Sequence, residues 1–175
     1  HIGPATHLQW WPEAQTVLLR FFDQHLKQVQ TGQSQLQLWD LGSKQWSSRP
    51  RPSALSWSLQ GEGLACLDPA SGRLNPNEAG VGEERIVHDP WRPVPAIGGH
   101  LSPSAGPADR QSLDARADVA TFTTAPLEDP LELAGQPQLQ IRAGADQPGF
   151  DLCLVLSRLP QGSAAVEQLS SGVLR

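Results

Sequence analysis

The sequence has little of several features that define common classes of protein. Its two cysteines are too few for a disulfide framework, and it has six tryptophans but no tyrosine. No apolar run approaches the ~20 residues that a membrane helix requires. Thirteen basic residues against eighteen acidic ones give a net charge of −5, whereas a nucleic-acid interface needs clustered Lys and Arg. We therefore expect no nucleic-acid partner and no membrane partner.

The cysteines and histidines bear on compartment and cofactors. Cys66 and Cys153 lie in apolar, strand-like contexts, where a free thiol is ordinarily a small buried hydrophobe. Because disulfides are rare in reducing compartments, two unpaired thiols indicate a cytoplasmic protein. His88 and His100 have no third ligand at a zinc-like spacing, so we expect no metal and no cofactor. No signal peptide is recognisable, although the chain begins without Met, so we expect its true beginning to lie upstream.

A chain of 175 residues is long enough for one domain with its own core, or for one domain and a piece of another. One helix is predicted, from about residue 12 to residue 29, with Pro12 at its first position. Its apolar residues recur at helical spacing and form one stripe, which consists of Val17, Leu18, Phe21, Phe22, Leu26 and Val29. We expect this stripe to be buried against a β-sandwich or against a second copy of the chain, which would make the protein a homo-oligomer.

A change of composition divides the chain. Residues 35–39 alternate as a strand, and residues 47–53, with two Arg-Pro pairs, indicate an extended linker. A helix and a strand precede this linker, whereas only short strands and turns follow it. We therefore predict two domains, residues 1–53 and residues 54–175.

The second part is rich in glycine and proline and carries most of the β signal. Residues 119–124 are β-branched and aromatic, and residues 131–133 and 138–142 alternate between apolar and polar with a period of two. Prolines separate these segments, because proline lacks the N–H that a strand ladder needs. The pattern predicts strands in the middle of an antiparallel β-sandwich, each with one buried face.

Three further segments complete the prediction. Residues 151–159 form the most apolar strand, which we expect to be buried on both faces at the centre of the sandwich. Residues 55–59 and 63–67 are predicted to form a hairpin, and residues 68–82 a surface loop. Residues 88–106 are dense in Pro and Gly, and a loop of that length in a compact domain is usually functional or packed down.

Several short motifs occur in an order that resembles a known family. Those in the central stretch are Arg116-x-Asp118-Val119, Phe122-Thr123, Pro126-Leu127, Leu131-Glu132 and Gly135. Those on either side are Asp89-Pro90, Pro93-Val94-Pro95, Gly98-Gly99, Asp151-Leu152 and Gly172-x-Leu174-Arg175. Together they resemble the C-terminal jelly-roll domain of X-Pro dipeptidyl peptidases and of cocaine-esterase-type acyl hydrolases, over most of the chain.

The resemblance implies a fold and a context. Residues 54–175 would form a galactose-binding-like jelly-roll β-sandwich, and residues 1–53 the tail of an α/β-hydrolase domain. In the family, further strands follow the segment that matches Gly172-x-Leu174-Arg175, so we expect the jelly roll to be incomplete at its C-terminus. The chain would be part of a serine hydrolase that takes a peptide or ester substrate through a catalytic domain missing here.

One residue is singled out as catalytic. Gly3-Pro4-Ala5-Thr6-His7 resembles the Gly-Pro-x-x-His segment that brings the catalytic histidine in these hydrolases, although the family has an aromatic residue where Ala5 stands. His7 would then be the general base of a Ser-His-Asp triad; the alternative is an ordinary loop histidine. The chain has no Gly-x-Ser-x-Gly elbow. In such hydrolases Ser and Asp precede His, so we expect this chain alone to be inactive.

The preferred function is a fragment of a serine hydrolase whose jelly-roll domain packs on the catalytic domain and shapes its substrate pocket. The alternatives are a non-catalytic carbohydrate- or protein-binding module, and a structural or oligomerising domain. An exposed row of tryptophans would favour the module, but we expect packing between sheets for Trp39, Trp46, Trp57 and Trp91. We expect turn starts and Arg–Asp pairs that pin a long loop onto a sheet, rather than an active site, at Asp89, Arg92, Asp109, Arg116 and Asp118.

Overall fold

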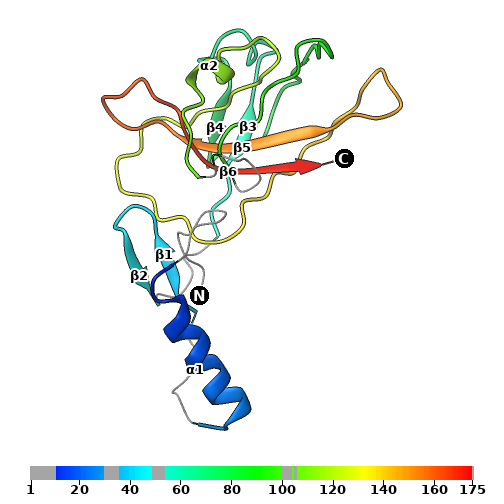
Figure 1. Ribbon diagram of the computed structural model, residues 1–175. Coiled ribbons are helices and arrows are strands. Elements are labelled where there is room, and N and C mark those ends of the chain that lie inside the picture. Colours follow the sequence, from blue (N-terminus) through cyan, green and yellow to red (C-terminus); the bar gives the residue numbers. More distant parts are fainter. Residues whose placement is uncertain (1–10, 30–35, 49–53, 100–103, 105, 175) are drawn as a thin grey trace. The chain divides into compact units, whose positions relative to one another are not determined.

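The computed structural model describes residues 11–29, 36–48, 54–99, 104 and 106–174. Within these residues the chain is mainly β, with three two-stranded antiparallel sheets and two helices (Figure 1). The predicted mainly β class is therefore confirmed. The chain divides into two compact units, residues 1–50 and residues 51–175.

The described part of the first unit is one helix and one hairpin. Helix α1 (Ala14–Leu26) lies within the predicted helical range. Strands β1 (Leu38–Asp40) and β2 (Gln45–Ser47) pair through a tight turn. The Asp40 carboxylate accepts hydrogen bonds from the N–H groups of Gly42 (2.7 Å) and Ser43 (3.0 Å). An aspartate that satisfies the N–H groups following it is a usual way to set such a turn.

Three half-buried indoles pack together on this hairpin. Trp39 lies opposite Trp46 in the strand register, and their ring centroids are 5.4 Å apart in an edge-to-face arrangement. The Trp11 ring lies 4.9 Å from that of Trp46. The predicted burial of Trp39 and Trp46 between sheets is wrong, because they are half-buried and pack against each other within one hairpin.

The apolar stripe of α1 is exposed. The helix has no buried residue, and Leu18, Phe21, Phe22 and Leu26 are 47%, 54%, 48% and 76% exposed. The expected burial of this stripe is therefore wrong for the single chain. Two neighbouring phenylalanines on one helix are nevertheless costly to leave in water, which is why their burial was predicted.

The second unit begins with a small sheet. Strand β3 (Ser58–Gln60) pairs antiparallel with β4 (Arg73–Asn75). Val81 extends the sheet beside β3, donating its N–H to the Leu59 carbonyl (3.1 Å), and Thr123 extends it beside β4, accepting the N–H of Leu74 (3.0 Å). Four segments therefore lie in the order Val81, β3, β4, Thr123.

This sheet corrects the predicted hairpin. The partner of β3 is β4, which lies in the segment predicted to be a surface loop, and not residues 63–67. Those residues turn instead, because the Glu84 carboxylate accepts the N–H groups of Gly63 (2.9 Å) and Ala65 (3.0 Å). A side-chain carboxylate thus takes the backbone donors that a strand neighbour would have taken.

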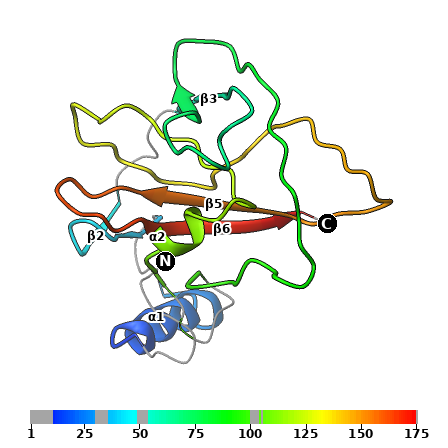
Figure 2. The ribbon, with the colours of Figure 1, turned by 90° about the horizontal axis from the view of Figure 1, so that it is seen from above.

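The longest strand pair lies at the C-terminal end of the chain. Strands β5 (Leu152–Arg158) and β6 (Glu167–Leu174) run antiparallel side by side, with a register shift between Leu156 and Ser157 (Figure 2). The strand predicted at residues 151–159 is confirmed. Its burial on both faces is not, because Cys153 is exposed.

Three predicted strands do not form. Residues 131–133 and 138–142 carry no regular secondary structure, and Leu139 and Ile141 are 42% and 44% exposed. Residues 119–124 are half-buried as predicted, yet they form only the single bridge at Thr123. A strand needs a paired neighbour, and a period-two pattern does not supply one.

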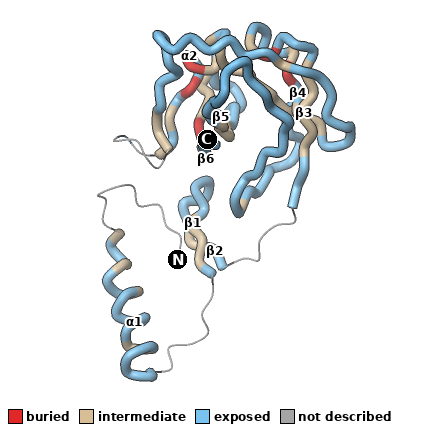
Figure 3. Tube along the Cα trace, turned by 90° about the vertical axis from the view of Figure 1, so that its right-hand side faces the viewer, coloured by how far each residue is buried: buried red, intermediate tan, exposed pale blue. Residues whose placement is uncertain are grey.

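The core of the second unit is small. Among the described residues its buried apolar side chains are Ala65 and Leu113, the latter on the short helix α2 (Gln111–Asp114). Figure 3 shows how few stretches of the tube are buried. Gly72 is buried as well, directly against the Thr121 backbone.

We predict that Gly72→Ala destabilises this unit. An added methyl group would overlap the Thr121 carbonyl oxygen, a backbone atom that cannot swing aside. Overpacking of this kind costs about 1–3 kcal/mol. Urea denaturation of the two proteins measures the difference. Gly144→Ala is the matched control, since a methyl group there meets no atom, and a Gly72→Ala variant as stable as this control would contradict the packing described.

Candidate functional site

The catalytic residue predicted from the sequence, His7, lies outside the described residues, as does His100. The two described histidines are His25, whose ring lies against Phe21, and His88, which is exposed. In the part of the chain that the structure describes, no three His, Cys, Asp or Glu side chains group as metal ligands, and no helix is long and apolar enough to cross a membrane.

The described site of most chemical interest is the Pro-rich segment of residues 89–99. It begins with a turn in which the Asp89 carboxylate accepts the Trp91 N–H (2.9 Å) and the Asp89 carbonyl accepts the Arg92 N–H (3.0 Å). Three prolines lie within it, and each fixes one backbone dihedral. The segment carries no regular secondary structure, so other contacts must hold it in place.

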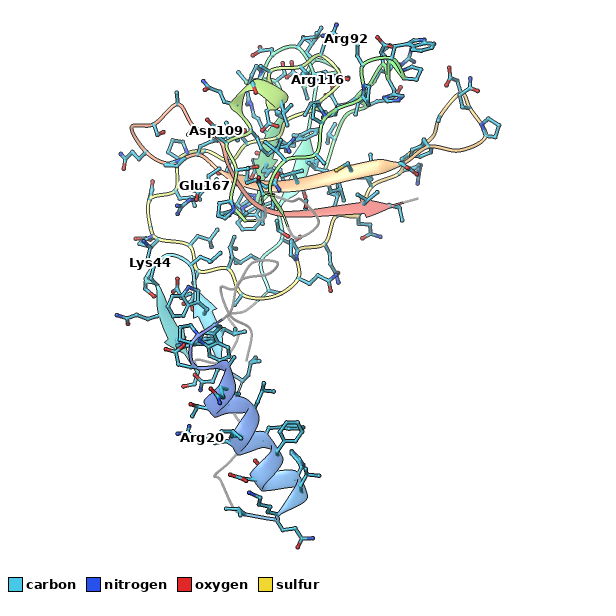
Figure 4. All side chains as sticks on the ribbon, viewed as in Figure 1. Arg20, Lys44, Arg92, Asp109, Arg116 and Glu167 are labelled. Carbon is cyan, nitrogen blue, oxygen red and sulfur yellow. The ribbon has the colours of Figure 1, made fainter. Side chains whose placement is uncertain are left out.

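An arginine holds the first part of this segment. The Arg116 guanidinium donates to both carboxylate oxygens of Asp118 (2.7 and 2.6 Å) and to the Arg92 carbonyl (2.6 Å); Figure 4 shows Arg92 and Arg116 close together. The guanidinium lowers the pKa of Asp118, and the same hydrogen bond raises the pKa of Arg116. The predicted Arg–Asp pair is confirmed, and its arginine also binds the long loop at Arg92.

A second arginine holds the far end. Arg110, buried against α2, donates to Asp114 (3.0 Å) and to the side-chain oxygen of Gln168 on β6 (3.1 Å). The amide of Gln168, which is 2% exposed, then donates to the Ile97 carbonyl (3.0 Å). Among the described residues, no buried side-chain nitrogen or oxygen atom lacks a hydrogen-bond partner, which is the condition for burying polar groups without loss.

Backbone pairing joins the same elements. Arg110 N–H donates to the Val166 carbonyl (2.7 Å) and Gln168 N–H to the Ala108 carbonyl (2.8 Å). The Asp109 carboxylate accepts the N–H groups of Gln111 and Val166, both at 3.0 Å, which lowers the pKa of Asp109. Figure 4 shows Asp109 close to Glu167, with which it forms a β-bridge.

Two glycines let residues 97–99 approach β6 closely. Gly98 and Gly99 have positive φ angles of 55° and 70°. A side chain at Gly98 would lie 2.5 Å from the Gly106 carbonyl oxygen, and one at Gly99 would lie 3.0 Å from the hydroxyl of Ser171. The dihedral angle favours glycine at both positions, and at Gly98 the nearby Gly106 backbone leaves no space for a side chain.

The segment leaves its largest side chain uncovered. Trp91 is 92% exposed, whereas the other described tryptophans, including Trp57, are half-buried. The predicted packing of Trp91 between sheets is wrong. Asp89 and Arg116 bind the backbone around Trp91, and neither of these contacts involves its indole.

The concave features beside these elements are small. A cavity of about 160 Å³ is lined by Ala65, Cys66, Leu67, Pro69, Asp114, Ala115 and Thr121. Burial and the nearby Glu84 and Asp118 carboxylates raise the pKa of the Cys66 thiol. A thiol with a raised pKa is a poor nucleophile at neutral pH.

The sequence did not identify Arg110 and Gln168 as partners. They lie 58 positions apart and neither belongs to a motif. In contrast, Arg116 and Asp118 are two residues apart, and their pairing could be predicted from that spacing.

Comparisons with known proteins place these features in context. The family model for the X-Pro dipeptidyl-peptidase C-terminal non-catalytic domain matches residues 8–175. A cocaine esterase from Rhodococcus sp. (strain MB1 Bresler) is 29% identical over 177 residues, which cover 93% of this chain and 30% of the esterase. The chain thus spans about a third of the length of this relative. No solved structure matches.

We predict that Asp118→Asn weakens the dependence of stability on acid pH. Because Arg116 lowers the pKa of folded Asp118, the pair stabilises the fold above the pKa of an unfolded Asp, about 3.9. That stabilisation is lost as the pH falls through the lowered folded value. Urea unfolding between about pH 6 and about pH 2 measures the slope.

Asp146→Asn provides the control, because Asp146 is exposed and no hydrogen bond or ion pair of its carboxylate is seen. The Asp146 variant should keep the acid slope of the unchanged chain. An Asp118→Asn variant with that same slope would show that the Arg116 pair does not stabilise the fold.

Proposed function

The chain belongs to the family of the X-Pro dipeptidyl-peptidase C-terminal non-catalytic domain, and from this we propose that it is part of a serine hydrolase. The observation that carries the proposal is the family match over residues 8–175, together with 29% sequence identity to an esterase more than three times as long. In this proposal the described units are the non-catalytic part of the enzyme, and the nucleophile lies in a catalytic domain upstream.

The proposed architecture is a jelly-roll β-sandwich that packs on an α/β-hydrolase domain. The exposed surface of this chain supports such packing. The stripe of α1 is uncovered, and further exposed apolar residues are Leu127, Leu131, Leu133, Leu139 and Ile141. Alternating segments without a strand partner fit an incomplete sandwich, because unpaired edges need a neighbour.

The proposed catalytic role of this chain rests on His7. It stands one residue before the range that matches the non-catalytic domain, which is where the last catalytic element of an upstream domain would end. As general base, His7 would take the proton of the serine hydroxyl as its oxygen attacks the substrate carbonyl. The imidazolium would then give that proton to the leaving group, and an upstream Asp would hold the ring.

The proposed reaction is hydrolysis of an acyl bond. The family name refers to an X-Pro dipeptidyl peptidase and the relative is an esterase. An amide and an ester react through the same acyl-enzyme, so one triad serves both. The domain of this chain would border the pocket and shape its specificity.

A non-catalytic carbohydrate- or protein-binding module remains the alternative, and the tryptophans do not favour it. Of the five that the structure describes, Trp91 is exposed while the other four are half-buried. A sugar platform needs several exposed aromatic faces in a row.

We predict that the isolated 175-residue chain hydrolyses neither an X-Pro anilide nor an aryl ester. A general base without its nucleophile cannot form the acyl-enzyme. Steady-state assays of the purified chain and of the full-length protein test this together. Turnover by the isolated chain that is lost in His7→Ala would contradict the proposed division of the triad.

We predict that His7→Ala in the full-length protein lowers kcat by several orders of magnitude with little change in stability. The base acts in the transition state, so substrate binding should be nearly intact. His25→Ala and His88→Ala are the controls and should stay within about tenfold of the unchanged enzyme. A normal kcat for the His7 variant would make the binding module the better description.

A further inference from the structure

We propose that Trp91 is an interface anchor that inserts its indole into the catalytic domain of the full-length hydrolase. The inference rests on the proposed function and names the contact through which the two parts meet. It combines three observations: the exposure of the indole, the rigid backbone that carries it, and the satisfied polar groups around it.

The exposed indole is not alone. Within nine residues the chain exposes Ile86 (48%), Val87 (81%), Trp91 (92%) and Val94 (37%). Single exposed apolar residues are normal on a protein surface, whereas a large contiguous apolar patch marks an interaction site. Tryptophan is also the residue type most enriched among those that dominate interface energies.

The backbone that carries Trp91 is held at both ends. Arg116 binds the Arg92 carbonyl, and Gln168 binds the Ile97 carbonyl with the support of buried Arg110. A backbone segment that is already ordered loses little conformational entropy on binding. The fold therefore uses two arginine networks to fix a segment whose largest side chain is 92% exposed.

The polar groups at the tip are satisfied within the chain. The N–H groups of Trp91 and Arg92 bond to Asp89, and the Arg92 carbonyl bonds to Arg116. A turn that enters an interface with unpaired backbone groups pays for their desolvation. This turn brings none at these three positions, so it can be covered by an apolar pocket.

The catalytic domain is the occupant that fits best. The related esterase has 70% of its length outside the region that this chain matches, and that remainder has to be joined to the domain. A covalently attached partner is present at high effective concentration, so one anchor and its apolar neighbours are enough to hold it.

Hydroxyl-radical footprinting of the isolated chain and of the full-length protein tests the proposal. The measured quantity is the oxidation rate of Trp91 relative to that of half-buried Trp57 in the same sample. We expect Trp91 to be the faster in the isolated chain and its ratio to fall on the order of tenfold in the full-length protein, because an anchor is shielded from water. An unchanged ratio would overturn the inference.

Two substitutions add an independent measurement. Trp91→Ser should leave the urea midpoint of the isolated chain unchanged and lower that of the full-length protein, and Trp91→Phe should restore most of the loss. Leu67→Ser is the matched control, since Leu67 is 70% exposed on another turn. Equal effects of Trp91→Ser in both proteins would contradict an anchor.

Two other outcomes are distinguishable. Protection of Trp91 that rises with concentration in the isolated chain, together with a dimer in sedimentation, would assign the anchor to a second copy and overturn the proposal. An active acyl hydrolase with exposed Trp91 would overturn this inference alone. A full-length protein with no hydrolase activity would overturn the proposed function, whatever Trp91 does.

Discussion

The second unit depends on arginines that bind carbonyl groups, directly or through glutamine. Arg110 reaches the Ile97 carbonyl through Gln168, and Arg116 reaches the Arg92 carbonyl itself. With Ala65 and Leu113 as its buried apolar residues in the described structure, this unit has little hydrophobic burial to hold an eleven-residue Pro-rich segment. Charge-assisted hydrogen bonds are about twice as strong as neutral ones. Here they hold the segment in place, as apolar packing does in a larger core.

Because polar contacts hold the second unit in place of a large apolar core, much of the chain's apolar surface stays exposed. Hydrophobic burial rises with the size of a domain, and a domain that completes its packing against a neighbour can leave part of that surface open. The stripe of α1 and the alternating residues 131–141 have the apolar pattern of a buried element, and their apolar side chains are exposed in the described structure. In an independent domain the same exposure would be an aggregation hazard.

The sequence predicted those features that depend on near neighbours. The helix at residues 14–26, the strand at residues 152–158 and the Arg116–Asp118 pair all follow from spacings within one element or turn. Contacts between distant segments were not predicted, such as the pairing of β4 with β3 and the hydrogen bond from the Gln168 amide to the Ile97 carbonyl. The predicted hairpin of residues 55–59 and 63–67 was wrong because the Glu84 carboxylate, about twenty positions away, accepts the N–H groups of Gly63 and Ala65. Period-two alternation gives the face of a strand but not its neighbour.

The same distinction applies to function. A catalytic histidine can be suggested by a short motif, because the motif encodes the local turn that presents it. An interface anchor such as Trp91 has no motif of its own; it becomes visible only when the contacts that fix its backbone are known and its side chain is found outside them. The two kinds of residue are also under different constraints. A general base must lie within hydrogen-bond reach of its nucleophile, whereas an anchor needs only a rigid backbone to carry it and a matching pocket. A non-catalytic domain can therefore influence an active site through the position that its anchor fixes, without a single residue in contact with the reacting atoms.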